Sequence, residues 1–364
     1  MLHIVRCLTV FAALSALSLA ASCSSQPAQL PKGGHVICST LPLYCFASAI
    51  AGDVMEVQLL PKPSIGPHSY QLTLADRKRL SGARAFIVNG LGLELGIPDA
   101  FLDELKVSGT PVIVAASELN ADFLRPSFCG ACAAHDAGLE DEGEHHHAHS
   151  HGEHDPHVWL CREGAIGLAR GICSGLVKLA PDKESKLRAN LGALEARINA
   201  LYDTMHAALD PLRGRKLLTF HEAWAYFADE FNFIIAATMT LSGRNVSLKA
   251  RQRIDELIRS GDVQTIFVEP QFDATIAREL AKETGVSLAT LDPAEVTMDK
   301  LSPDCYFAAM ERNLAELRKA FGLVKNEQPV GEIPAHGRDS RVVDKGRDSA
   351  FLRYEDSSCL CRRA

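Results

Sequence analysis

Residues 35–60 read HVICSTLPLYCFASAIAGDVMEVQLL, and this stretch predicts the fold. It begins with a short apolar run, His35 to Thr40, and ends with a second one, Val54 to Leu60. Between these runs, the segment from Leu43 to Ala51 is typical of a helix. A strand, a helix and a second strand in this order favour a parallel sheet flanked by helices.

The same alternation continues in two blocks on either side of a helical middle. The first block adds a helix, a strand, a helix and a strand, expected at Thr73 to Ser81, Ala85 to Asn89, Phe101 to Lys106 and Val112 to Ala115. Two long helices follow, from Arg162 to about Leu179 and from Asp182 to about Leu209, on either side of Pro181. The second block has expected strands at Lys216 to Phe220, Phe233 to Thr238, Thr265 to Glu269 and Ser287 to Thr290. Its helices are expected at Ala223 to Glu230, Leu248 to Arg259, Ala274 to Thr284 and Tyr306 to Phe321. The sequence therefore predicts an α/β protein with two units, each built on a mainly parallel sheet.

The two ends of the chain look different from this folded part. Residues 1–22 have a basic start and an apolar run from Leu8 to Ala21, which indicates a secretory signal peptide. Small residues then precede Cys23, as in the lipobox of bacterial lipoproteins, so we expect either a lipid anchor at Cys23 or ordinary cleavage and export. Either way, the protein would be periplasmic or anchored on the outer side of the membrane. Residues 23–34 are interpreted as a polar tether and residues 323–364 as a disordered tail.

Length and charge narrow the class of protein. Removing 22 residues from 364 leaves 342, which suits two lobes better than one core. The net charge of -7, without a basic cluster in the folded part, argues against a nucleic-acid partner. Among the eleven cysteines, Cys38, Cys45, Cys161 and Cys173 lie in apolar runs and are predicted to be buried. Cys129 and Cys132 have CxxC spacing, for which a disulfide and accessory metal-binding thiolates both remain open.

A histidine-rich segment lies between the two blocks. Residues 140–157 contain seven of the fourteen histidines, together with several carboxylates. A run of this composition cannot form a core, so residues 140–154 are predicted to be a solvated, metal-attracting loop. Its histidines are His145, His146, His147, His149, His151 and His154.

Four further residues lie where predicted strands or their loops end. His68 follows the strand that ends at Leu60, and His221 directly follows the strand Lys216 to Phe220. His157 precedes the first long helix, and Asp292 follows the strand Ser287 to Thr290. Ligands of open α/β sheets bind beyond the carboxyl ends of strands, and a proline beside three of these positions stiffens the loops. The pattern predicts that His68, His157, His221 and Asp292 form a metal site.

Sequence signatures of common enzymes are missing. His221-Glu222 does not begin an HExxH motif, because the fourth residue after His221 is Ala225. The chain has neither a G-x-S-x-G elbow nor a P-loop. A metal-dependent hydrolase, with Glu222 or Glu269 as the general base, stays open as an alternative hypothesis.

Taken together, the motifs resemble those of the ZnuA-like, or cluster A-I, solute-binding proteins, which bind zinc or manganese for ABC importers. The resemblance covers nearly all of residues 35–322 and includes LPLY at 41–44, IAGD at 50–53, PHSY at 67–70, NGLGLE at 89–94, DPHVWL at 155–160, FHEAWAYF at 220–227, FVEPQF at 267–272 and LDP at 291–293. It implies an N-terminal lobe at 35–160, a long rigid linker helix at 161–180 and a C-terminal lobe at 181–322. It also implies a monomer that holds metal between its lobes at the four positions named above. The metal would be delivered to the membrane permease of an ABC importer, without catalysis. Glu269 would support the site without being a ligand.

The ligand chemistry predicts which metal binds. Three imidazoles and one carboxylate suit tetrahedral zinc, whereas manganese prefers more oxygen ligands. In the resembling family, manganese binders tend to have a carboxylate at the position of His221. Zn²⁺ is therefore expected, and Mn²⁺ is less favoured. A manganese-specific binding protein and an adhesin of the same fold remain alternatives, which differ from the first hypothesis in metal or partner.

Overall fold

The computed structural model describes residues 34–127, 153–239, 248–297 and 300–324. The predicted signal peptide, Cys23 and the tether up to residue 33, and the tail from residue 325 on, lie outside these residues. So do Cys129, Cys132 and five of the six loop histidines, His145, His146, His147, His149 and His151. Within the described ranges, no helix is both long and apolar enough to cross a membrane.

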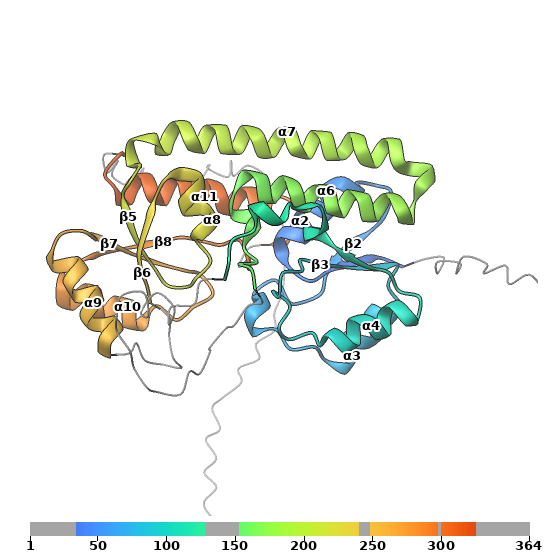
Figure 1. Cartoon of the computed structure of the whole chain (residues 1–364), viewed down its shortest axis with the longest axis horizontal. Coiled ribbons are helices and arrows are strands. Elements are labelled where there is room, and N and C mark those ends of the chain that lie inside the picture. Colours follow the sequence, from blue (N-terminus) through green and yellow to red (C-terminus); the bar gives the residue numbers. More distant parts are fainter. Residues whose placement is uncertain (1–33, 128–152, 240–247, 298–299, 325–364) are drawn as a thin grey trace, which may run out of the picture. The chain divides into compact units, whose positions relative to one another are not determined.

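The first lobe contains a four-stranded sheet. Its strands are β1 (Val36–Cys38), β2 (Val57–Leu59), β3 (Ala85–Val88) and β4 (Val112–Val114). They lie in the order β2-β1-β3-β4, and all neighbours are parallel. Helices α2 (Leu41–Ala51), α3 (Leu74–Ser81) and α4 (Asp99–Val107) connect them (Figure 1). The carboxyl ends of these strands therefore lie at one edge of the sheet.

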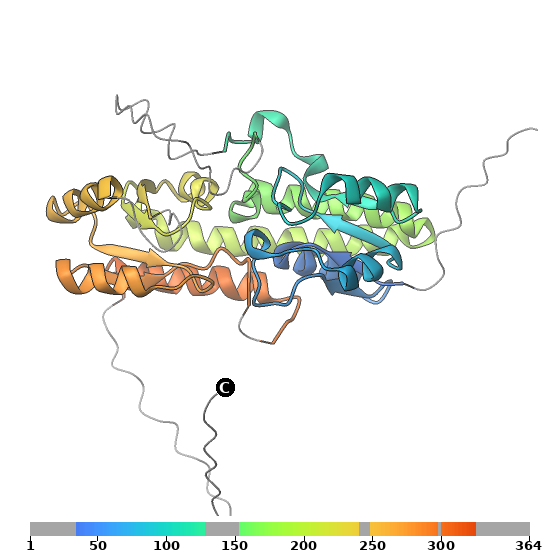
Figure 2. The ribbon, with the colours of Figure 1, turned by 90° about the horizontal axis from the view of Figure 1, so that it is seen from below.

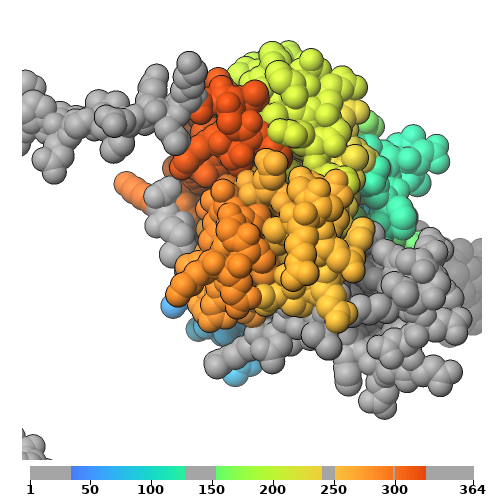
Figure 3. Space-filling view, turned by 90° about the vertical axis from the view of Figure 1, so that its left-hand side faces the viewer, coloured from blue at the N-terminus to red at the C-terminus, as the bar shows by residue number. Residues whose placement is uncertain are grey.

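The second lobe repeats this arrangement. Strands β5 (Lys216–Thr219), β6 (Ile234–Thr238), β7 (Thr265–Val268) and β8 (Ser287–Thr290) form a parallel sheet in the order β6-β5-β7-β8. The helices α8 (Ala225–Phe231), α9 (Leu248–Arg259) and α10 (Thr275–Thr284) connect these strands. Figure 3 shows α9 and α10 side by side on the outer surface of this lobe. The predicted α/β class, with two mainly parallel sheets, is confirmed.

The connection between the lobes differs from the prediction. The helix expected to link them, 161–180, is α6 (Arg162–Leu179), and it packs against α2, β4 and residues 115–118 of the first lobe. Four glycines of α6 make this close packing possible: a Cβ on Gly171 would lie 2.0 Å from the Ala115 carbonyl oxygen, and Gly164, Gly167 and Gly175 are similarly crowded. The longer helix α7 (Glu184–Leu209) contacts α6 and α2 of the first lobe and also α11 (Cys305–Ala320), which packs on β8 (Figures 1 and 2). The linking helix is therefore α7, and α6 is part of the first lobe.

One hydrophobic core runs through both lobes. It begins at β1 and α2, continues through α6 and α7, and reaches Phe267 of β7 and Met310 of α11. Two smaller clusters lie apart from it, one in each lobe. Cys38, Cys45, Cys161 and Cys173 are buried free thiols, as predicted from their apolar surroundings. Because the main core is continuous, the loops at the carboxyl ends of the two sheets are held in a defined relation.

Candidate metal centre

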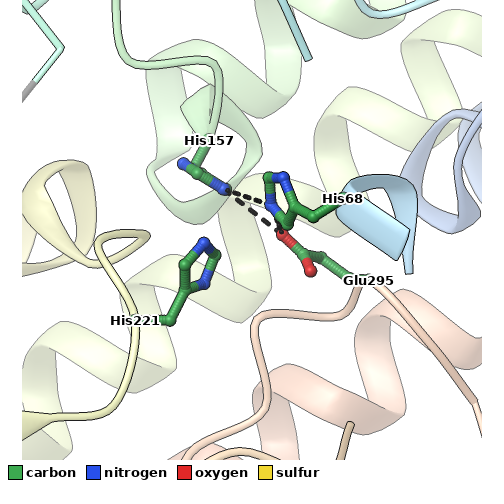
Figure 4. Close-up of side chains that lie close together, drawn as sticks. All are labelled: His68, His157, His221 and Glu295. Atoms are coloured by element: carbon green, nitrogen blue, oxygen red, sulfur yellow. Dashed lines mark hydrogen bonds and ion pairs between the residues drawn. The ribbon is translucent and has the colours of Figure 1, made fainter. Parts of the chain in front are cut away.

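Four side chains from separate loops converge between the lobes. His68 lies in a single helical turn, Pro67–Ser69, after β2, and His157 lies just before the turn Val158–Leu160 that leads into α6. His221 follows β5, and Glu295 lies in the loop after β8. One nitrogen or oxygen atom of each side chain lies within 4.8 Å of those of the other three, and all four side chains point toward one another (Figure 4). Positions far apart in the chain thus form a single group.

The spacing of three of the four ligand atoms fits a small tetrahedral cation. His157 Nε2 lies 3.3 Å from His68 Nε2 and 3.3 Å from Glu295 Oε1, and His68 Nε2 lies 3.1 Å from Glu295 Oε1. Zinc bonds of about 2.0–2.2 Å in a tetrahedron place neighbouring ligand atoms roughly 3.3–3.6 Å apart. A zinc ion bound by His68, His157 and Glu295 would therefore need only a small outward movement of these three side chains, and the ligand atom of His221 lies within 4.8 Å of theirs.

The cluster is shielded from water. The side chains of His157 and Glu295 are 0% and 1% exposed, and those of His68 and His221 are 7% and 9% exposed. The Nε2 atom of His221 is buried and has no hydrogen-bond partner among the described residues. A buried polar atom without a partner is costly, which favours a role as a metal ligand.

Asp155 orients the imidazole of His157. Its Oδ1 atom lies 2.7 Å from His157 Nδ1 and accepts a hydrogen bond from the His157 main-chain N–H at 3.0 Å. This contact leaves Nε2 directed at the cluster, as is usual for metal-binding histidines. Burial lowers the pKa of His157, but Asp155 and Glu295 outweigh this effect and raise it to about 10. The two carboxylates beside His157 thus favour its protonated form in the metal-free protein.

Glu269 has a similar position beside His221. Its Oε2 atom lies 3.4 Å from His221 Nδ1, while Trp224 Nε1 donates to Oε1 at 2.9 Å and Gln271 Nε2 donates to Oε2 at 2.8 Å. Burial lowers the pKa of His221, but the charge of Glu269 and its hydrogen bond raise it overall. Glu269 thus contacts a cluster residue from outside and is not part of the cluster itself.

Asp292 is not part of the cluster, which corrects the sequence prediction for the fourth position. Its Oδ1 atom accepts a hydrogen bond from the Ala294 N–H at 2.8 Å, and its Oδ2 atom lies 3.3 Å from Arg312. The carboxylate therefore faces its own loop and α11, and Glu295, three residues later, takes the fourth position. The sequence contained a signal for this outcome, because aspartate side chains in turns commonly bond to the main chain two residues further on.

The base of the histidine-rich segment lies close to the centre. His154, the one loop histidine within the described ranges, pairs with Pro126 in an isolated antiparallel bridge. Next to this bridge, Tyr226 of α8 accepts a hydrogen bond from the Arg125 N–H and donates one to the Asp155 carbonyl oxygen. The C-terminal end of the segment, at His154, is thus held against Pro126, three residues before His157.

A family model described as zinc-uptake complex component A, periplasmic (ZnuA), matches residues 36–320 of this chain. The chain belongs to the ZnuA family. The chain is 28% identical to the zinc-binding lipoprotein AdcA of Streptococcus pneumoniae serotype 4, over 93% of this chain and 64% of AdcA. It is 29% identical to the high-affinity zinc uptake system protein ZnuA of Yersinia pestis, over 73% of this chain and 85% of that protein. The chain thus spans less than two thirds of the AdcA relatives' length.

Solved structures share this ZnuA-family fold. Zinc-bound AdcA from Streptococcus pneumoniae is similar with a TM-score of 0.64 and 25% identity, over 79% of this chain and 58% of that one. A ZnuA variant lacking residues 138–173, also solved with zinc bound, has a TM-score of 0.61 and 25% identity, over 79% of this chain and 98% of that one. These likenesses confirm the predicted solute-binding protein fold.

Proposed function

We propose that this chain is an exported solute-binding protein that holds one Zn²⁺ ion with His68, His157, His221 and Glu295 and delivers it to the permease of an ABC-type importer. The observation that carries this proposal is the buried group of three imidazoles and one carboxylate, whose ligand atoms all lie within 4.8 Å of one another. Membership of the ZnuA family and the names of the zinc-binding relatives support it.

Zinc is preferred over manganese because of the ligands. Neutral imidazole suits zinc, whereas Mn²⁺ favours oxygen ligands. Glu295 is the one carboxylate in the cluster, since Asp155 and Glu269 each contact a histidine from outside. With four protein ligands buried together, the site also matches the closed shell typical of non-catalytic zinc.

The hydrolase alternative has less support. A catalytic zinc needs an open position and a base that can reach its water. Both carboxylate oxygens of Glu269 accept hydrogen bonds from Trp224 and Gln271, and its side chain is fully buried. A cavity of about 290 Å³ is lined by Glu222, but of the four cluster residues only His221 borders it. A substrate in this cavity would contact only one of the four proposed ligands, His221.

The histidine-rich loop and the location complete the proposal. Residues 140–154 would collect zinc weakly and close to the tight site, because their C-terminal end lies three residues from His157. The protein would act as a monomer in the periplasm, or anchored through Cys23 on the outer side of the membrane.

Calorimetric titration with zinc and with manganese tests this function. We expect the whole chain to bind one zinc ion tightly and manganese more weakly. The change His221→Ala should weaken the tight site by roughly 100-fold or more, since even partners outside a metal's ligand set contribute about 10- to 100-fold. His206→Ala is the matched control, because His206 lies on α7 and pairs with Glu230 away from the cluster. Tight zinc binding by the His221→Ala variant, or tighter binding of manganese than of zinc, would contradict the proposal.

A further inference from the structure

The loop after β8 is held by the side chain of Asn313, which the sequence analysis did not predict to have a role. The last main-chain hydrogen bond of β8 runs from the Leu291 N–H to the Val268 carbonyl oxygen. At the next residue, Asp292, the main chain bonds to the side chain of Asn313 on α11 instead of to a neighbouring strand. The Asp292 N–H donates to Asn313 Oδ1 at 2.7 Å, and Asn313 Nδ2 donates to the Asp292 carbonyl oxygen at 2.8 Å. Asn313 is 1% exposed, so both bonds are shielded from water.

The turn that follows depends on this support. Asp292 Oδ1 accepts a hydrogen bond from the Ala294 N–H at 2.8 Å, and Ala294 has a φ angle of 60°. Residues other than glycine, asparagine and aspartate rarely adopt this left-handed conformation, so the surrounding contacts must hold it in place. From the other lobe, Trp159 Nε1 donates to the Pro293 carbonyl oxygen at 2.7 Å. Hydrogen bonds thus hold Asp292, Pro293 and Ala294, the three residues before Glu295.

The direction of Glu295 follows from this turn. Its side chain reaches His68 and His157 at 3.1 and 3.3 Å, while Asp292, three residues earlier, is turned toward α11. If Asp292 were released, the turn could relax at Ala294, and the Glu295 carboxylate would leave the cluster. The three histidines come from other loops and would keep their places.

We propose that Asn313 is a positioning residue for metal binding, which acts through the main chain of Asp292 to keep Glu295 in the cluster. The proposal rests on the proposed function, because it takes Glu295 as a zinc ligand. Only a side-chain amide offers one donor and one acceptor side by side in a short side chain, which matches the N–H and carbonyl of one residue. Aspartate lacks the donor, and an aliphatic residue would leave both main-chain groups buried without partners.

A double-mutant cycle tests whether Asn313 acts through Glu295. Zinc affinity is measured by chelator competition for the whole chain and for Asn313→Ala, Glu295→Ala and the double variant. We expect Asn313→Ala to weaken zinc binding by about 10- to 100-fold in the wild-type background and to add almost nothing when Glu295 is already absent. The absorption spectrum of bound Co²⁺ should change in the same way in both single variants.

The outcomes separate this proposal from the function on which it rests. An equal loss of affinity in both backgrounds, or no loss in the wild-type background, would overturn the positioning role while leaving Glu295 as a ligand. Unchanged zinc affinity in Glu295→Ala would overturn the four-residue ligand set, and the positioning role with it. Asn190→Ala is the matched control, since Asn190 also donates from Nδ2 to a main-chain oxygen, that of Ile50, at 2.9 Å. It should leave zinc affinity unchanged.

A second pair of variants keeps the test valid if Asn313→Ala does not fold. Asp292→Ala removes the acceptor for the Ala294 N–H, whereas Asp292→Asn keeps an oxygen in the same place. A positioning role predicts that Asp292→Ala weakens zinc binding about 10-fold or more and that Asp292→Asn restores most of it. An equal loss in both variants would indicate that the charge of Asp292 itself matters, and would overturn the proposed mechanism.

Discussion

Trp159 donates its indole N–H to the carbonyl oxygen of Pro293, 2.7 Å away, and this buried hydrogen bond joins the two lobes. Trp159 lies two residues after His157, and Pro293 lies two residues before Glu295. The bond therefore connects the loops that supply one cluster residue from each lobe. On its other side, the Trp159 carbonyl oxygen accepts hydrogen bonds from the hydroxyls of Tyr306 and Tyr202.

Replacing this indole should destabilise the metal-free protein. Trp159→Phe keeps most of the packing but leaves the Pro293 carbonyl without its donor, which should lower the free energy of unfolding by about 1–3 kcal/mol. Trp159→Ala also opens a cavity and should cost about 3–5 kcal/mol. Urea denaturation without metal measures both values. If Trp159→Phe has the same urea denaturation midpoint as the wild type, this hydrogen bond does not contribute to joining the lobes.

Asp155 should matter for zinc affinity although it is not in the cluster. Asp155→Ala removes the partner of His157 Nδ1, so the imidazole can rotate and its Nε2 becomes less basic. We expect zinc binding to weaken by about 10- to 100-fold in chelator competition. Asp203→Ala, which removes an exposed carboxylate paired with Arg162, serves as the control and should have no effect. Equal affinities in the two variants would argue against the orienting role of Asp155.

Zinc affinity should rise with pH above neutrality. From the sequence we expect affinity to fall as the pH drops through about 6.5, the ordinary pKa of histidine. In the structure, burial opposes protonation of His157, but Asp155 and Glu295 raise its pKa to about 10. A zinc ion must displace this proton, so affinity should increase between about pH 7 and pH 9, with proton release on binding. Calorimetry in buffers of different ionisation enthalpy counts the released protons, and pH-independent affinity over this range would contradict the assignment.

The same pKa has the opposite consequence for the stability of the metal-free protein. Because the folded-state pKa of His157 lies above its unfolded value, its ion pairs stabilise the fold fully below about pH 6.5. This contribution is lost as the pH rises toward about 10. Denaturation of the metal-free chain at several pH values should show a loss of stability in this window. Bound zinc should make this loss of stability smaller.

Removing the histidine-rich loop should leave the tight site intact. A deletion of residues 140–151 spares His154 and its bridge to Pro126, next to Asp155. Calorimetry should then show one tight zinc site with nearly unchanged affinity, and the weaker sites should be lost. Loss of the tight site would mean that the loop supplies one of its ligands.

A pair of glycine variants tests the packing of α6. A Cβ on Gly171 would lie 2.0 Å from the Ala115 carbonyl oxygen, so Gly171→Ala should destabilise the protein by about 1–3 kcal/mol through overpacking. Gly192 lies on α7 with nothing within 4 Å of such a Cβ, so Gly192→Ala should stabilise it by about 0.4–1 kcal/mol. Thermal unfolding compares the two. Similar effects of both changes would contradict the close contact of α6 with the first lobe.

Local sequence patterns were sufficient to predict the α/β class, most element positions and three of the four cluster residues. Apolar runs of strand length alternate with helical segments, and these patterns are local properties of the chain. For His68, His157 and His221, the loop ends at which they lie were also local features, so they could be found without knowing the contacts. The buried thiols followed from their apolar neighbours in the same way.

The choices between Asp292 and Glu295 and between α6 and α7 depend on contacts in the folded protein. Asp292 and Glu295 follow the same strand, and what separates them is the position of Asn313 on a later helix, which holds Asp292 and leaves Glu295 to face His68, 227 residues away in the chain. Likewise, α6 and α7 are adjacent long helices, and their roles differ because α6 packs closely on the first lobe while α7 contacts elements of both. Such choices depend on contacts between residues distant in sequence, which no local pattern contains.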